Sequence, residues 1–269
     1  MWAFLLLTLF MLFTVTFGYG TRSVLDSNLS VSEVISKSVI QAYGNALEDY
    51  LRVTSVQAPS DIDELVNTQG YEYLASIRPN DIGYAVTTIT DRRLTYQRVL
   101  IYIQPVGNYK TRDEYLSATN NQCGTEGFDS AQEWCVNDGS IWFLTDNRKV
   151  INEQIQETTY QLDVILQKFA YSYQVEGVFP NKKNDSTVIA DNSSVSLSDA
   201  VGYTDTPGSC SGHFDFYGAP LTCNNLFDVA GNPIIYHRHN DQFISVYTVL
   251  PYLDSAGENL VYSRNLEVY

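Results

Sequence analysis

The first twenty residues of this chain contain no charged side chain. Twenty residues of helix rise about 30 Å, which matches the thickness of bilayer hydrocarbon. The run therefore predicts a helix that needs an apolar environment on every side, either a membrane or the core of an assembly. Its apolar positions include Trp2, Phe4, Leu5, Leu6, Leu9, Phe10, Leu12, Phe13, Val15 and Phe17.

A cleaved secretory signal also places an apolar run at the N-terminus of a chain. Such signals normally begin with Lys or Arg and end in small residues spaced as in Ala-x-Ala. This run begins Met1-Trp2 and ends Phe17-Gly18-Tyr19-Gly20, which fits neither feature. Because the run has no basic residue at its start, we predict that Met1 is the first residue after a leader that has been removed.

The apolar pattern continues beyond the uncharged run. Between Val24 and Leu51, apolar residues recur at spacings near three and four with charged residues between them, which predicts an amphipathic helix. Its predicted packed stripe comprises Leu25, Leu29, Val31, Val34, Ile35, Val39, Ala42, Ala46, Leu47, Tyr50 and Leu51. Since the first proline is Pro59, one helix from Met1 to about Val53, roughly 80 Å long, is predicted. Gly18, Gly20 and Gly44 are its predicted points of bending.

With this N-terminal pattern, the chain resembles type IV pilins and the pseudopilins of type II secretion. The resemblance implies that Met1 is the processed and N-methylated residue, and that the helix from Met1 to about Val53 forms a filament core. It also implies assembly with copies of the chain or with other pilins, from the inner membrane to an extracellular pilus. Leu5 stands where the family usually has Glu, which points to a minor or tip subunit.

The remainder of the chain predicts an α+β fold in which the long helix packs on an antiparallel sheet. A short helix capped by Ser60 or Asp61, two strands within 84–104 and a strand at 140–144 form the predicted first lobe. A second amphipathic helix, from a cap at Asp146 to Gly177, and a strand at 243–249 form a second pilin-like lobe. The predicted parts are residues 1–53, 54–145 and 146–269.

The second lobe contains a sequence that resembles a turn of the same family. Asp228-Val229-Ala230-Gly231-Asn232-Pro233 is similar to the family's Asp-x-Trp-Gly-Asn-Pro turn, with Ala230 in the place of Trp. In such a turn we expect Gly231 to adopt a positive φ angle.

The four cysteines lie in two close pairs, Cys123 with Cys135 and Cys210 with Cys223. Four thiols allow three connectivities, of which sequential pairing is the simplest. Zinc is the alternative, but neither pair has the tight spacing of a zinc knuckle. Disulfides are therefore predicted, and they indicate an oxidising compartment.

The chain carries 16 basic and 31 acidic residues, a net charge of -15, and nucleic acid is not an expected partner. One local basic run lies between Arg92 and Arg112, where we expect the cations to meet acidic neighbours or other subunits.

Candidate chemistry is sparse. Cys210 lies in Gly208-Ser209-Cys210-Ser211-Gly212, which superficially fits a nucleophile elbow but is a disulfide candidate. A metal site could combine Asp215 with the three histidines, since alternate strand residues face one side. Calcium at loop acids is a further alternative that no spacing specifies. The histidines are His213, His237 and His239, and the loop acids are Asp185, Asp191, Asp228 and Asp241.

The leading hypothesis is thus a structural filament subunit that acts by packing and adhesion, without an enzymatic activity, a cofactor or a metal. The alternatives are a membrane-anchored periplasmic binding protein or enzyme, and a secreted disulfide-containing binding module.

Overall fold

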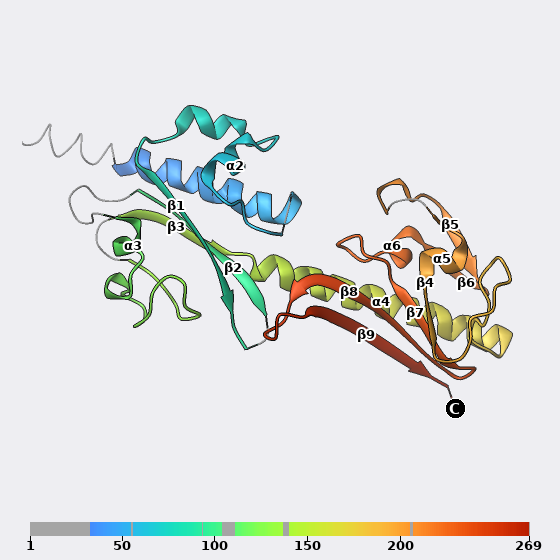
Figure 1. Cartoon of the computed structure of the whole chain (residues 1–269). Helices are drawn as coiled ribbons and strands as arrows, with labels where there is room; N and C mark the ends of the chain where they lie inside the picture. The colour runs from blue at the N-terminus through green and yellow to red at the C-terminus, as the bar shows by residue number, and fades with distance from the viewer. Residues whose placement is uncertain are drawn as a thin grey trace, which may run out of the picture. The chain divides into compact units, whose positions relative to one another are not determined.

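The computed structural model describes residues 33–54, 56–92, 94–103, 111–136, 140–204 and 207–268 (Figure 1). It is a mixed α+β structure with antiparallel sheets, as predicted. The predictions that concern residues 1–32, including Met1 and every position of the uncharged run, lie outside the described residues.

The first described helix covers residues 33–53 and is called the N-terminal helix below. The later helices are α2 (Ile62–Asn67), η1 (Glu72–Ile77), α3 (Arg112–Tyr115), η2 (Ala118–Asn120), α4 (Arg148–Glu176), α5 (Leu197–Val201), η3 (Pro207–Ser209) and α6 (Cys223–Leu226). The strands are β1 (Ile82–Thr90), β2 (Thr95–Ile103), β3 (Ile141–Asp146), β4 (Ser193–Ser196), β5 (His213–Phe216), β6 (Ala219–Thr222), β7 (Ile235–Asn240), β8 (Phe243–Leu253) and β9 (Asn259–Glu267).

The chain divides into two compact units. Unit 1 comprises Met1–Thr88 and Gln97–Asp146, and unit 2 comprises Ile89–Tyr96 and Asn147–Tyr269. Strands occur in three sheets, with the orders β1-β2-β3, β4-β7-β8-β9 and β5-β6.

In unit 1 the N-terminal helix lies across the three-stranded sheet (Figure 1). Its buried stripe comprises Ile40, Tyr43, Ala46, Leu47, Tyr50 and Leu51. Leu25, Leu29 and Val31 of the predicted stripe lie outside the described residues, and the prediction is wrong at Val34 and Ile35, which are 65% and 57% exposed. At about 100° per residue, Val34 points to the side opposite Tyr43, whereas Ile35 lies nearly in line with the buried Ala46 but is exposed at its own level of the helix.

The N-terminal helix is unbroken at Gly44, because residues 33–53 are continuously helical. A Cβ atom added at Gly44 would overlap the ring of Phe143 on β3. The glycine therefore serves close packing: it lets an aromatic ring of the sheet rest directly against the helix backbone.

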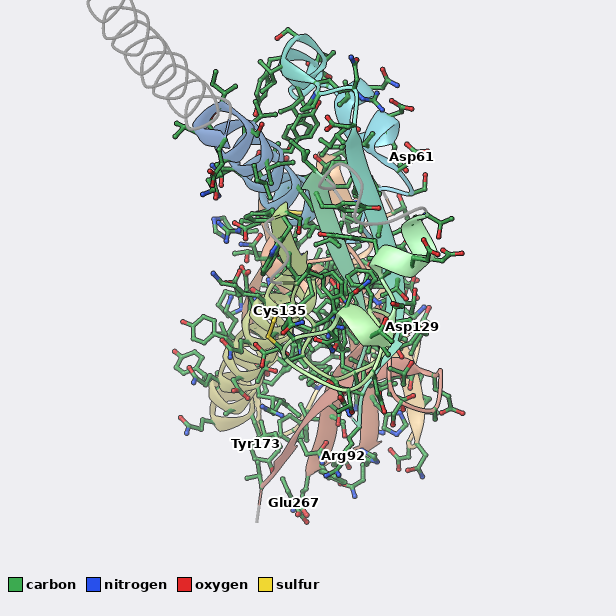
Figure 2. All side chains as sticks on the ribbon, turned by 90° about the vertical axis from the view of Figure 1, so that its left-hand side faces the viewer. Asp61, Arg92, Asp129, Cys135, Tyr173 and Glu267 are labelled. Atoms are coloured by element: carbon green, nitrogen blue, oxygen red, sulfur yellow. A yellow bond between two sulfur atoms is a disulfide. The ribbon has the colours of Figure 1, made fainter. Side chains whose placement is uncertain are left out.

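The other face of this sheet is covered by the loop that carries the first disulfide. β2 and β3 pair antiparallel with Leu100 opposite Leu144, and alternation places Leu144 on the face opposite to Phe143. The buried cluster on the loop side comprises Ala85, Leu100, Tyr102, Tyr115, Phe128, Trp134 and Val136. Cys123 and Cys135 form the predicted disulfide within this loop (Figure 2).

Arg98 of β2 holds the disulfide loop on the sheet. Its buried guanidinium donates hydrogen bonds to the carbonyl oxygens of Phe128 (3.0 Å), Ser130 (2.9 Å) and Gln132 (2.9 Å). Arg98 belongs to the basic run for which we expected acidic neighbours, but its partners here are backbone carbonyl groups. One side chain thereby satisfies three carbonyl acceptors of the loop.

Unit 2 is built on α4, which confirms the predicted second helix. The helix begins after Asn147 instead of Asp146, and it ends at Gly177, whose φ of 77° is left-handed. Phe169 of α4 lies at 0% exposure against the rings of Phe216 and Tyr236. This aromatic cluster joins the helix to the sheet β4-β7-β8-β9, whose strand pairs are all antiparallel.

The second predicted disulfide, between Cys210 and Cys223, is also present in unit 2. Within the described ranges, no helix is both long and apolar enough to span a bilayer.

Candidate functional site

Strand β7 carries a pair of histidines on the face of its sheet that is turned away from α4. Tyr236 and Arg238 are buried, and Tyr236 belongs to the core beneath α4. His237 and His239 are half-buried and alternate with these residues, so they project from the opposite face. We call His237 and His239 the histidine pair.

An irregularity in the strand pairing positions the second histidine. The register of β7 with β8 shifts between Arg238, which faces Ile244, and Asn240, which faces Phe243. The extra residue at this shift is His239. Bulges of this kind change the direction of a side chain, and here the imidazole of His239 lies beside that of His237.

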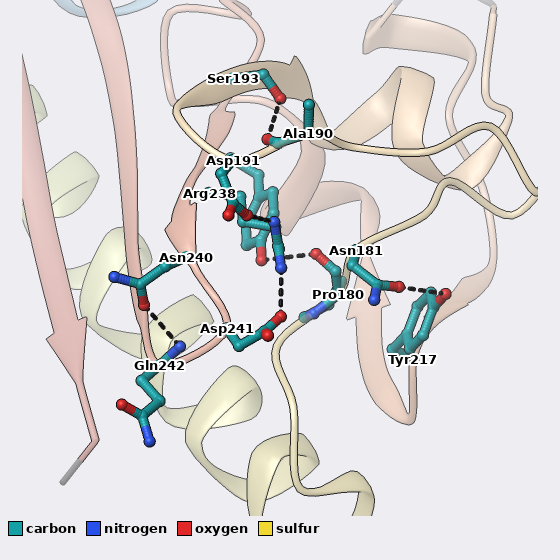
Figure 3. A network of polar contacts seen from close by, with 11 residues as sticks. Pro180, Asn181, Ala190, Asp191, Ser193, Tyr217, Arg238, Asn240, Asp241 and Gln242 are labelled. Carbon is teal, nitrogen blue, oxygen red and sulfur yellow. Dashed lines mark hydrogen bonds and ion pairs between the residues drawn. The ribbon is translucent and has the colours of Figure 1, made fainter.

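Arg238 fixes the strand from beneath the histidine pair. Figure 3 shows its guanidinium between the carboxylates of Asp191 and Asp241, to both of which it donates hydrogen bonds. The Tyr236 hydroxyl donates to the carbonyl oxygen of Pro180 at 2.9 Å. These contacts tie the loop before β4 and the turn after β7 to the same strand, so the end of β7 is held from both sides.

The two imidazole rings are close and each is anchored by a serine. Their centroids lie 4.3 Å apart with an interplanar angle of 69°. Nδ1 of His237 lies 2.7 Å from the hydroxyl oxygen of Ser194, and Nε2 of His239 lies 2.7 Å from that of Ser245. His239 also stacks on Phe243 with centroids 4.1 Å apart. Each ring thus contacts a serine hydroxyl through one of its nitrogens, and the second nitrogen takes no part in that contact.

The electrostatic environment favours the neutral form of one of these rings. Burial lowers the pKa of His239 below the usual histidine value, and the nearby His237 lowers this pKa further. A neutral imidazole has one nitrogen that donates and one that accepts, so it can act as a ligand as well as a hydrogen-bond donor.

The structure does not assemble the metal site that was expected from three histidines and Asp215. His213 and Asp215 lie on β5, which belongs to a different sheet from β7. Across the described residues, no group of three or more His, Cys, Asp or Glu side chains is arranged to hold a metal ion.

The loop acids that were considered for calcium each serve a local structure. The Asp185 carboxylate accepts a hydrogen bond from the backbone N–H of Thr187 at 2.8 Å. Asp191 and Asp241 bind Arg238, and Asp228 caps a turn that is described next. Their oxygens therefore act as acceptors and ion-pair partners within the chain.

The turn that starts at Asp228 has the conformation expected from the sequence. Gly231 has a φ of 82°, as predicted. The buried Asp228 carboxylate accepts from the backbone N–H groups of Ala230 (2.9 Å) and Asn232 (2.8 Å), and from the hydroxyl of Thr248 (2.8 Å). The Thr248 contact could not be read from the sequence, because it joins residues from separate elements.

The cysteine of the elbow-like sequence is not a free thiol. Cys210 is bonded to Cys223, and η3 and β5 flank it in place of the strand and helix that an elbow requires. A thiol nucleophile at this position is therefore excluded in the oxidised chain.

A second surface lies in the first described turn of the N-terminal helix. Val34 and Ile35 are exposed there beside an ion pair between Lys37 and Glu33, whose nitrogen and oxygen are 2.6 Å apart. We call Val34 and Ile35 the helix-start surface. These are two adjacent exposed aliphatic side chains in the first described turn of the helix.

Comparisons of the chain with protein-family models, with curated proteins and with solved structures find no match.

Proposed function

We propose that this chain is a structural subunit of a type IV pilus-like extracellular filament. The support comes from the order of its parts. In unit 1, a helix is packed on an antiparallel sheet whose strands β2 and β3 are joined by the disulfide loop, and in unit 2 the long helix α4 is again packed on an antiparallel sheet with a disulfide nearby. This arrangement accords with the resemblance of the sequence to pilins, and with a second pilin-like lobe.

The observation that carries the proposal is the exposure of the helix-start surface. Farther along the same helix, the apolar stripe between Ile40 and Leu51 is buried within unit 1, whereas Val34 and Ile35 have no such cover. Fully burying a Val or Ile side chain contributes about 1.5–3 kcal/mol. A neighbouring helix of a second copy, or of another pilin, would provide this burial.

The apolar side chains of the uncharged run at residues 1–20 would also need to be buried by a partner or a membrane. Exposing such a run to water would cost tens of kcal/mol at about 25 cal/mol per Å² of apolar surface. The inner membrane would cover it before assembly, and like helices would cover it in the filament core. The protein would act by packing and adhesion, and Leu5 in place of the family's Glu favours a minor or tip position.

The test is to place charge on the helix-start surface of the full-length chain, in cells that make the filament. The double substitution Val34→Asp and Ile35→Asp should remove the protein from sheared filaments while its amount in the membrane is unchanged. Val53→Asp is the matched control, because Val53 is a 73% exposed aliphatic residue at the other end of the same helix. We expect this control to assemble normally.

The outcomes separate the proposal from its alternatives. Mass spectrometry should find an intact chain with a methylated Met1. A mature chain that starts near Thr21 would instead indicate a secreted binding module. A membrane-retained chain that never appears in filaments by electron microscopy would indicate a membrane-anchored periplasmic protein, and equal assembly of the double variant and the control would contradict the helix-start argument.

A further inference from the structure

The two imidazoles of the histidine pair in unit 2 lie close together on one face of β7. Alternate residues of a strand project from one face, and the bulge at His239 brings its ring to a centroid distance of 4.3 Å from that of His237. We propose that His237 and His239 together bind one divalent transition metal ion, with Zn²⁺ and Cu²⁺ as the fitting class. This site is independent of the filament proposal.

The serine contacts determine which nitrogens are available to the metal. Ser194 occupies Nδ1 of His237 and Ser245 occupies Nε2 of His239, so Nε2 of His237 and Nδ1 of His239 would be the ligand atoms. In metal sites, a ligating histidine usually donates its other ring N–H to an oxygen, which fixes the tautomer and the ring orientation. Both histidines already have such an oxygen partner.

The surroundings hold the rings in place before any ion binds. Phe243 stacks against His239, and beneath the strand Arg238 is tied to Asp191 and Asp241 (Figure 3). A ligand pair on a rigid strand loses little freedom when it binds, which favours affinity.

Ligand type and charge also favour a cation at this position. Metal binding requires neutral imidazoles. Imidazole nitrogen is a preferred ligand of zinc, copper and nickel, whereas magnesium and calcium prefer oxygen. The net charge of -15 raises the local concentration of cations around the chain.

The site would be open. In the described part of the chain no third His, Cys, Asp or Glu joins the pair, so water or a donor from another molecule would fill the remaining coordination positions. We therefore expect weaker binding than that of a four-ligand structural site, and ready exchange with chelators.

The test uses the full-length chain in detergent, in a non-chelating buffer. Titration calorimetry with Zn²⁺ and with Cu²⁺ should show one saturable site per chain, and the electron paramagnetic resonance spectrum of bound Cu²⁺ should show nitrogen ligands. His237→Gln and His239→Gln should each weaken binding by at least about tenfold, since each removes one of two protein ligands. His213→Gln is the matched control, because His213 lies on another sheet and should leave binding unchanged.

Circular dichroism and the thermal midpoint of each variant would show that it is folded, so that lost binding is not lost structure. The proposal is overturned if neither ion binds saturably. It is overturned equally if both histidine variants bind as well as the unsubstituted chain, since the ions would then be held by other groups such as the acidic surface.

Discussion

Among the described residues, units 1 and 2 each have one buried arginine that holds a loop to a sheet, but the two arginines meet different partners. Arg98 donates to three neutral carbonyl oxygens of the disulfide loop in unit 1. Arg238 donates to two carboxylates in unit 2, on the loop before β4 and on the turn after β7. The first arrangement depends on backbone geometry, and the second depends on charge.

The exposure of the partners determines what each loop loses without its arginine. The side chains of Asp191 and Asp241 are 60% and 64% exposed, so water can solvate them if the guanidinium is removed. Phe128, whose carbonyl oxygen is one of the acceptors of Arg98, is itself buried. An unpaired buried acceptor is expensive, whereas an unpaired exposed carboxylate is not.

The largest expected difference between the units follows from replacing each arginine by methionine, which keeps much of the aliphatic stem. Arg98→Met should reduce the free energy of unfolding of unit 1 by about 3 kcal/mol, because the buried carbonyl oxygen of Phe128 and two part-buried carbonyl oxygens lose their donor. Arg238→Met should cost unit 2 only about 1–2 kcal/mol. Hydrogen exchange of the amides in 128–132 and in 189–193, measured by mass spectrometry, would report the two losses separately. Equal costs, or a larger cost in unit 2, would break the comparison.

The units also differ in how the helix meets the sheet. Unit 1 uses Gly44 to admit the ring of Phe143, whereas α4 of unit 2 contains no glycine and packs through Phe169. Gly44→Ala should destabilise unit 1 by about 1 kcal/mol, because overpacking costs about 1–3 kcal/mol and the gain in helix propensity offsets about 1 kcal/mol.

Two further variants would check the cause of this loss by urea denaturation. Asn45→Ala, at an exposed neighbouring position, should be neutral or slightly stabilising. Phe143→Leu should recover part of the loss in the Gly44→Ala background and be destabilising alone. If the double variant lost as much stability as the sum of the two single variants, the ring and the glycine would not interact.

The smallest expected effect is a pH dependence that is confined to unit 2, because all three histidines of the chain lie there. The pKa of His239 is lowered in the folded state, so the unfolded chain binds a proton there at higher pH than the folded chain does. The contribution of His239 is therefore complete above the ordinary histidine pKa of about 6.5 and decreases as pH falls toward the folded value.

Hydrogen exchange of β7 and β8 at about pH 8 and about pH 5 would measure this change. His239→Gln should reduce the pH dependence in unit 2. A matching change in unit 1 would mean that the effect comes from another group.

Much of the fold follows from patterns within short segments of the sequence. The β-branched and aromatic residues of 84–104 predicted two strands, which the structure has as β1 and β2. The apolar spacing from Val150 to Phe169 predicted α4. β9 was not predicted, because it is an outer strand whose exposed side chains are mostly polar, and such a strand lacks a continuous apolar signal.

The candidate site was only partly visible in the sequence. The spacing of His237 and His239 indicated that both face one side of a strand, and this is confirmed. Their serine partners were not predicted, because Ser194 and Ser245 reach the pair through the register of three strands. The long helix before residue 33, the processing of Met1 and the filament core remain predictions from the sequence.

The contact between the ring of Phe143 and Gly44 also fixes the rotation of the N-terminal helix about its own axis. A helix seated on a ring in this way cannot turn about its own axis without driving a larger neighbouring side chain into the sheet. Each residue advances the direction of its side chain by about 100°, so fixing one position fixes the others. The direction in which Val34 and Ile35 face is thus set inside unit 1, several turns away from them, before any neighbour approaches.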